Sequence, residues 1–163
     1  LNQIDIAEYQ QAAGDMTQSL IESGVLSRTS QTPVIAISRI RNNTTQQIDT
    51  DLLVKKIRVD LSRSGRAEIT TVIGLGGRAE DPLAQGEAQR AEFFNDGEDP
   101  NVGIARPNYT LSGKIIEQRA RAGKTREVTY VFQLSLTDVT RGTAVWEDER
   151  SFSQQGSRHA VGW

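Results

Sequence analysis

Residues 127 to 137 read Glu-Val-Thr-Tyr-Val-Phe-Gln-Leu-Ser-Leu-Thr, a stretch in which large apolar side chains recur at every second position. This period of two predicts an antiparallel strand with one buried face, because successive side chains of a strand point to opposite sides of the sheet. Segments of strand length flank it at 109 to 118 and 143 to 152, and residues 138 to 142 supply turn-forming Asp and Gly. We therefore predict an antiparallel meander of three strands. The predicted apolar face of the central strand comprises Val128, Tyr130, Phe132, Leu134 and Leu136.

The N-terminal part predicts helices and strands in alternation. Apolar residues at steps of three and four predict a helix over 5 to 23, with Asp5 as its N-terminal cap and Gly24 at its C-terminal end. An apolar run predicts a strand over 33 to 40, and the polar residues 41 to 47 predict an exposed loop.

A second helix is predicted to begin at Asp49 or Thr50 and to end at Gly65, with a strand over 67 to 73 after it. A strand, a helix and a strand in this order imply a right-handed crossover and a parallel pair. The glycine-rich middle of the chain predicts only a short helix, over 82 to 94.

Together these elements predict an α+β fold, with a small mixed sheet of about five strands and helices packed on it. The sheet would contain a parallel N-terminal pair and the antiparallel C-terminal meander. A chain of 163 residues with 36% hydrophobic content supports one core. We therefore expect residues 1 to 163 to form a single globular domain, a monomer, with residues 154 to 163 as a flexible tail.

The amino-acid composition argues against several classes of function. Nineteen Lys and Arg stand against twenty-one Asp and Glu, so the net charge of −2 argues against a nucleic-acid binder. The chain has no cysteine, which excludes disulfides, thiolate nucleophiles and cysteine-ligated metal sites. The longest apolar run is far shorter than the roughly 20 residues that span a bilayer.

Three patterns that could carry catalysis lack their partners. Residues 74 to 79 match G-x-G-x-x-A, but acids and a proline follow where a phosphate site needs a helix N-terminus. On a strand, Glu147 and Glu149 would point one way and Asp148 the other, which argues against a carboxylate pair. The single histidine, His159, could assist a nucleophilic serine, but the sequence has no G-x-S-x-G motif to position one. We therefore predict no catalytic residue, no cofactor and no metal site, and a function in binding.

Four segments carry a family resemblance through their order and spacing: residues 34 to 45 (Val-Ile-Ala-Ile-Ser-Arg-Ile-Arg-Asn-Asn-Thr-Thr), 108 to 115 (Asn-Tyr-Thr-Leu-Ser-Gly-Lys-Ile), 130 to 138 (Tyr-Val-Phe-Gln-Leu-Ser-Leu-Thr-Asp) and 142 to 149 (Gly-Thr-Ala-Val-Trp-Glu-Asp-Glu). They resemble the LpoB-type family, outer-membrane lipoproteins that activate class A penicillin-binding proteins. The resemblance covers most of residues 33 to 156, with the glycine-rich middle poorly matched.

The resemblance implies a periplasmic domain that a lipidated N-terminal cysteine and a linker tether to the outer membrane. It also implies a fold similar to the N-terminal domain of TolB, the Tol-system propeller protein, and to curli-type export lipoproteins. The implied activity is non-catalytic, since the domain would bind a peptidoglycan synthase and stimulate glycan polymerisation and cross-linking. The chain begins at Leu1 without Met or a targeting segment, so we expect that the natural N-terminus, with any anchor, was removed.

The candidate contact surface combines the predicted polar loop with the basic tip of the first predicted hairpin, residues 119 to 126. Its positive charges suit an acidic protein surface, although charges at a tip also discourage edge pairing. The predicted partner-binding residues are Arg41, Asn42, Asn43, Thr44, Arg121, Lys124 and Arg126.

Two other functions stay open. One is a component of another envelope assembly or export system with the same fold, curli-like or Tol-like. The other is a small glycan-active enzyme that uses Glu147 or Asp148.

Overall fold

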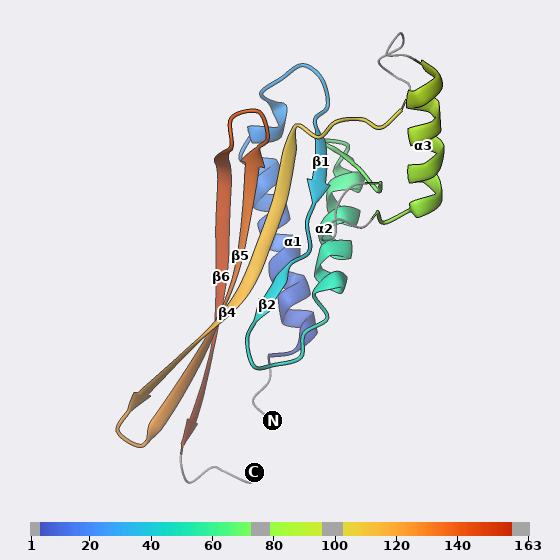
Figure 1. Cartoon of the computed structure of the whole chain (residues 1–163). Coiled ribbons are helices and arrows are strands. Elements are labelled where there is room, and N and C mark those ends of the chain that lie inside the picture. The colour runs from blue at the N-terminus through green and yellow to red at the C-terminus, as the bar shows by residue number, and fades with distance from the viewer. Residues whose placement is uncertain (1–3, 73–78, 96–102, 158–163) are drawn as a thin grey trace.

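In the computed structural model, two helices pack on one face of a mixed β-sheet and a third helix stands away from this body (Figure 1). The structure describes residues 4–72, 79–95 and 103–157. In chain order its helices and strands are α1 (Ile6–Glu22), β1 (Val34–Ile37), β2 (Arg41–Asn43), α2 (Thr50–Ser64), β3 (Glu68–Ile69), α3 (Pro82–Asn95), β4 (Tyr109–Ala122), β5 (Thr125–Asp138) and β6 (Thr143–Ser157). The predicted α+β fold is confirmed, with six strands in the described part of the chain.

Local sequence signals set the ends of the two packed helices. The Asp5 carboxylate accepts a hydrogen bond from the backbone N–H of Ala7, and Asp49 caps α2 in the same way. After these helices, Gly24 and Gly65 adopt left-handed backbone angles, with φ values of 80° and 69°. The predicted starts and stops of both helices are therefore confirmed.

The strands lie in the order β3-β1-β4-β5-β6, and β2 also pairs with β4. The predicted parallel pair is present, because β1 runs parallel to β3 as well as to β4. Strands β4, β5 and β6 form the predicted antiparallel meander. Strand β3 contains only Glu68–Ile69, so the prediction of a strand over 67 to 73 was too long.

The predicted loop at 41 to 47 was wrong at its start, where Arg41–Asn43 forms β2 parallel to β4. All three β2 side chains are exposed, so no apolar pattern reveals a strand that only backbone pairing holds. Ile37 pairs with Leu111, and Arg41 pairs with Lys114. The first two residues of these pairs are four positions apart, whereas their partners in β4 are only three positions apart. The extra residue bulges the chain between β1 and β2.

Gly113 lies in β4 opposite this bulge, where the strands approach too closely for a side chain. A Cβ at this position would lie 2.7 Å from the backbone oxygen of Gln133 and from Leu134 Cδ2. Glycine therefore lets β4 lie close to β5 at this point.

The core lies between the inner face of the sheet and helices α1 and α2. The predicted apolar face of β5 turns inward, with Tyr130, Phe132, Leu134 and Leu136 buried. Tyr9 of α1 contacts Phe132 edge to face, with ring centroids 6.2 Å apart. No helix of the described ranges lies on the opposite face of β4, β5 and β6 (Figure 1).

The three long strands extend beyond the helical layer. There β4 and β5 form a hairpin that projects from the body (Figure 1). Strand β4 continues to Ala122 and β6 to Ser157, past the predicted ends at 118 and 152. Of the predicted flexible tail, residues 154–157 belong to β6, and residues 158–163 lie outside the described ranges.

Helix α3, predicted over 82 to 94, has no buried residue and stands apart from the sheet (Figure 1). Leu83, Phe93 and Phe94 are each more than three-quarters exposed. None of the helices in the described ranges has the length and apolar character needed to cross a bilayer.

Candidate docking surface

A buried carboxylate joins the turn after β2 to the projecting hairpin. Glu117 of β4 accepts hydrogen bonds from the backbone N–H and the hydroxyl of Thr45, at 3.0 and 2.9 Å. Arg119 Nε donates to the second carboxylate oxygen at 2.6 Å and Arg119 Nη2 donates to Thr45 Oγ1 at 3.2 Å. The Glu117 side chain is only 7% exposed. The turn after β2 is therefore bonded to the base of the projecting hairpin.

These contacts stabilise the ionised forms of the Glu117 carboxylate and the Arg119 guanidinium. The Thr45 backbone N–H is the main cause that holds the pKa of the Glu117 carboxyl below its ordinary value, and the hydrogen bond from Arg119 lowers it further against the effect of burial. The hydrogen bond to Glu117 also raises the pKa of the Arg119 guanidinium.

The turn itself is held by its own side chains. Asn42 Nδ2 donates to the Gln46 carbonyl at 2.7 Å, while Asn42 Oδ1 accepts from the backbone N–H and the hydroxyl of Thr44. Asn42 and Thr44, both predicted contact residues, therefore shape the turn. Arg41 and Asn43 are exposed beside it.

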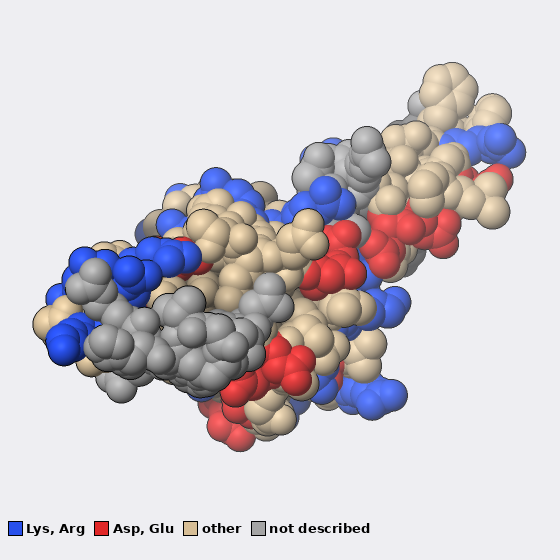
Figure 2. Space-filling view, turned by 90° about the horizontal axis from the view of Figure 1, so that it is seen from below, with Lys and Arg blue, Asp and Glu red and all other residues tan. Residues whose placement is uncertain are grey.

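The hairpin tip carries the other three predicted residues. Arg121 lies directly opposite Arg126 across β4 and β5, and Lys124 lies in the turn where Gly123 has a φ of 62°. All three cations are exposed, and they form no ion pair with any described residue. Figure 2 shows Lys and Arg side chains gathered at this end of the molecule. Such a tip suits charge-assisted hydrogen bonds to carboxylates of a partner.

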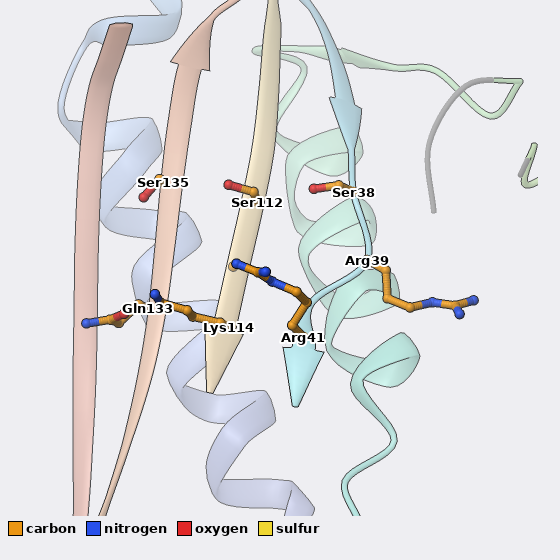
Figure 3. Close-up of a pocket in the computed structure, with 8 residues that line it drawn as sticks. Ser38, Arg39, Arg41, Ser112, Lys114, Gln133 and Ser135 are labelled. Carbon is orange, nitrogen blue, oxygen red and sulfur yellow. The ribbon is translucent and has the colours of Figure 1, made fainter. Parts of the chain in front are cut away.

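An open groove of about 620 Å³ crosses the uncovered sheet face above the bulge. Arg41 and Lys114 extend over it, whereas Arg39 points away and pairs with Asp51 (Figure 3). Among the described residues, no side-chain hydrogen bond or ion pair involves the Arg41 guanidinium or the Lys114 ammonium group. Sequence reasoning missed Lys114, although the period of two in β4 places it on the face opposite the buried Ile115. The groove is lined by Ser38, Arg39, Arg41, Ser112, Gly113, Lys114, Gln133 and Ser135.

The far side of the same face is acidic. Glu147 and Glu149 of β6 accept hydrogen bonds from Ser135 and Gln133, at 3.1 and 3.0 Å. Asp148 instead pairs with Arg150 at 2.8 Å, so the predicted alternation of the three acids is confirmed. The uncovered face therefore carries cations over β2 and β4 and carboxylates over β6.

The remaining sequence patterns add no geometry. Residues 74–78 of the glycine pattern and His159 lie outside the described ranges. Among the residues that the structure describes, no group of three His, Asp or Glu side chains is placed to hold a metal ion.

The structure is an α+β domain in which helices cover one face of the mixed sheet, while the other face and the hairpin are uncovered and charged. Such exposed charged surfaces are suited to binding another protein. The chain belongs to the family of the peptidoglycan-synthase activator LpoB, whose model matches residues 8–152. The family resemblance seen in the sequence is thereby confirmed, and with it a general role in activating peptidoglycan synthesis in the cell envelope. This family is regulatory rather than catalytic.

A solved structure supports the same fold, and a second is similar to this chain. The LpoB C-terminal domain from Salmonella enterica is 12% identical, with a TM-score of 0.51, and the match covers 90% of this chain and 98% of that chain. The corresponding domain from Escherichia coli is 14% identical over the same shares, with a TM-score of 0.49. No curated protein sequence matches the chain.

Proposed function

We propose that this chain binds a class A penicillin-binding protein and raises its synthetic activity by docking, without catalysing a reaction itself. The observation that carries this proposal is the family match across residues 8–152. Binding activates the synthase to the extent that the domain has higher affinity for its active state than for its inactive state.

The proposed contact surface is the basic hairpin together with the segment from Arg41 to Thr44. The Glu117 connection supports this choice, because it presents both segments in one orientation and reduces the ordering cost of binding. The exposed cations of the hairpin would steer association with an acidic surface of the synthase.

We also propose that the full-length protein works as a monomer in the periplasm, anchored to the outer membrane through a lipidated N-terminus. The family assignment supports a periplasmic lipoprotein. Labelling the full-length protein with a radioactive fatty acid and fractionating the membranes tests this placement. Recovery without lipid in the cytoplasm would contradict it.

Activation is tested by adding the purified domain to a purified class A penicillin-binding protein of the same organism. We expect a saturable increase in the rate at which glycan strands form from the lipid-linked precursor, together with measurable binding. A synthase that neither binds the domain nor changes its rate would refute the proposal.

Charge reversal tests the surface. Arg121→Glu, Lys124→Glu and Arg126→Glu together should lower the association rate constant about tenfold at low salt and weaken its salt dependence, because the net attraction to an acidic surface is reduced. The matched control reverses Lys55, Arg63 and Arg141, three exposed cations on other surfaces, and should bind nearly as wild type. Stopped-flow measurements at two salt concentrations compare them, and equal rates for both triple variants would exclude the hairpin.

A further inference from the structure

Strand β6 forms one edge of the sheet. It pairs with β5 on one side, and no described strand pairs with its other side. A long edge strand presents unpaired backbone N–H and C=O groups that can take up another strand, so folded proteins usually guard such edges. Only part of the β6 edge is protected in this way.

The guarded part is centred on Glu149. Its backbone N–H donates to Asp148 Oδ1 at 2.8 Å, and its carbonyl accepts from Arg150 Nη1 at 2.9 Å. Asp148 and Arg150 also form an ion pair at 2.8 Å. The backbone groups of Glu149 therefore face away from β5, and two neighbouring side chains already occupy them.

The following residues are open at the same edge. In an antiparallel pair, backbone groups of alternate residues point to the same side, so Ser151 and Ser153 also turn their N–H and C=O groups outward. No described group bonds to these outward backbone atoms. Residues 151 to 157 read Ser-Phe-Ser-Gln-Gln-Gly-Ser, without a charge or a proline that would oppose pairing.

We propose that the β6 edge from Ser151 to Ser157 takes up an extended acidic segment of the synthase as an added strand. This inference rests on the function proposed above and specifies how the partner binds. Backbone hydrogen bonds would supply affinity, as in other cases of strand addition.

Charge indicates which kind of segment fits. Arg126 pairs across the ladder with Gly156, so an added strand would lie two strand spacings from it, about 10 Å, which is close to the Debye length at 0.1 M salt. Arg121 and Lys124 add to the positive field at this end. An acidic segment suits that field better than a second copy, which carries the same basic hairpin.

The other exposed edge of the projecting ribbon is less suitable. Beyond Asn43, β4 has no described strand on its β2 side. That edge begins at the Glu117 and Arg119 ion pair, with the Thr45 turn bonded against it. Charged side chains and a covering loop are devices that protect an edge.

Amide hydrogen exchange, read at single residues in the domain with and without the purified class A penicillin-binding protein, tests the proposal. In the free domain the amides of Ser151 and Ser153 should exchange fast, while that of Phe152, bonded within the ladder, is protected. Binding should slow exchange at Ser151 and Ser153 at least about tenfold.

A pair of variants provides the second test. Ser153→Pro removes one outward N–H and leaves the ladder to β5 intact, whereas the control Ser153→Ala keeps the N–H. Both lose the contact between Ser153 and Thr129 hydroxyls. We expect Ser153→Pro to bind the synthase about tenfold more weakly than Ser153→Ala, because a backbone hydrogen bond is lost and the ring obstructs the added strand.

The outcomes are separable. If the domain binds the synthase and neither the exchange of Ser151 and Ser153 nor the variants differ, strand addition is wrong and the proposed function stands. If no binding occurs at all, both fail. If sedimentation shows a homodimer that Ser153→Pro abolishes, the edge pairs with a second copy and the choice of an acidic synthase segment is overturned.

Discussion

Glu117 shows how one residue can organise a surface that is distant from it in sequence. Its carboxylate lies on β4, 72 positions from the Thr45 groups that it accepts hydrogen bonds from. Arg119, two residues along the strand on the same side, completes the contact. A nearly buried carboxylate needs such partners, because burying it without them carries a large desolvation cost.

Replacing this carboxylate should cost stability in a pH-dependent way. At neutral pH, Glu117→Gln should lower the free energy of unfolding by about 1 to 2 kcal/mol, because charge-assisted hydrogen bonds are lost. The folded pKa lies below the ordinary value near 4.5, so this contribution is fully present above that value. It disappears as the pH falls through the lowered pKa.

Urea denaturation from neutral to acidic pH measures this effect. Glu68→Gln, at an exposed carboxyl on β3, is the control and should differ little from wild type at any pH. A constant difference between Glu117→Gln and wild type down to strongly acidic pH would show that the ionised carboxylate is not responsible.

At the scale of elements, α3 is attached to the body by few contacts. Arg58 of α2 pairs with Glu80 at 2.7 Å, and Gln85 Nε2 donates to the Val72 carbonyl at 3.0 Å. The backbone N–H of Asp81, just before α3, also donates to the Thr71 carbonyl at 2.7 Å, and the Arg58 side chain is only 10% exposed. A helix held in this way should open independently of the core.

Exchanging the ion pair for neutral groups tests this attachment. Arg58→Met combined with Glu80→Gln should speed amide exchange of α3 while changing the global unfolding free energy by less than about 1 kcal/mol. Glu80→Gln alone should destabilise the body by about 1 to 3 kcal/mol, because it leaves the Arg58 guanidinium without its charge partner. Unchanged exchange across Pro82–Asn95 in the double variant would show that other contacts hold the helix.

At the scale of the whole molecule, one sheet separates stability from binding. Its inner face packs against α1 and α2, while the outer face and the projecting hairpin carry the exposed charges. Substitutions at the hairpin can therefore change binding without loosening the core, which is the condition under which charge reversal reports on the interface.

Removing a central core residue should affect the entire domain. Phe132 of β5 is fully buried and packs against Tyr9, so Phe132→Ala should lower the unfolding free energy by about 3 to 5 kcal/mol. Val139→Ala, at a residue 48% exposed in the β5–β6 turn, should change it by less than about 0.5 kcal/mol. Thermal or urea unfolding of both variants checks the ratio, and a small effect at Phe132 would contradict the described packing.

Local patterns predicted the elements whose side chains report their environment. The alternation in β5, the caps of α1 and α2 and the short helix near Pro82 were all confirmed. Strand β2 was missed because its exposed side chains carry no such signal. The candidate surface was predicted only as two polar segments, and Lys114 and the clamp by Glu117 were not foreseen, since spatial proximity across 72 positions leaves no local pattern.

The sequence by itself determined the fold class, the family and the lack of cysteine and of a histidine cluster, because composition, periodicity and motif order are properties of the chain. The tertiary structure alone decided that the turn after β2 meets the hairpin, that Arg41 and Lys114 share one groove, and that no described strand pairs with the outer edge of β6 beyond Arg150. The physical reason is that these features depend on the pairing of distant strands, and backbone hydrogen bonds pair strands with little regard to side-chain identity.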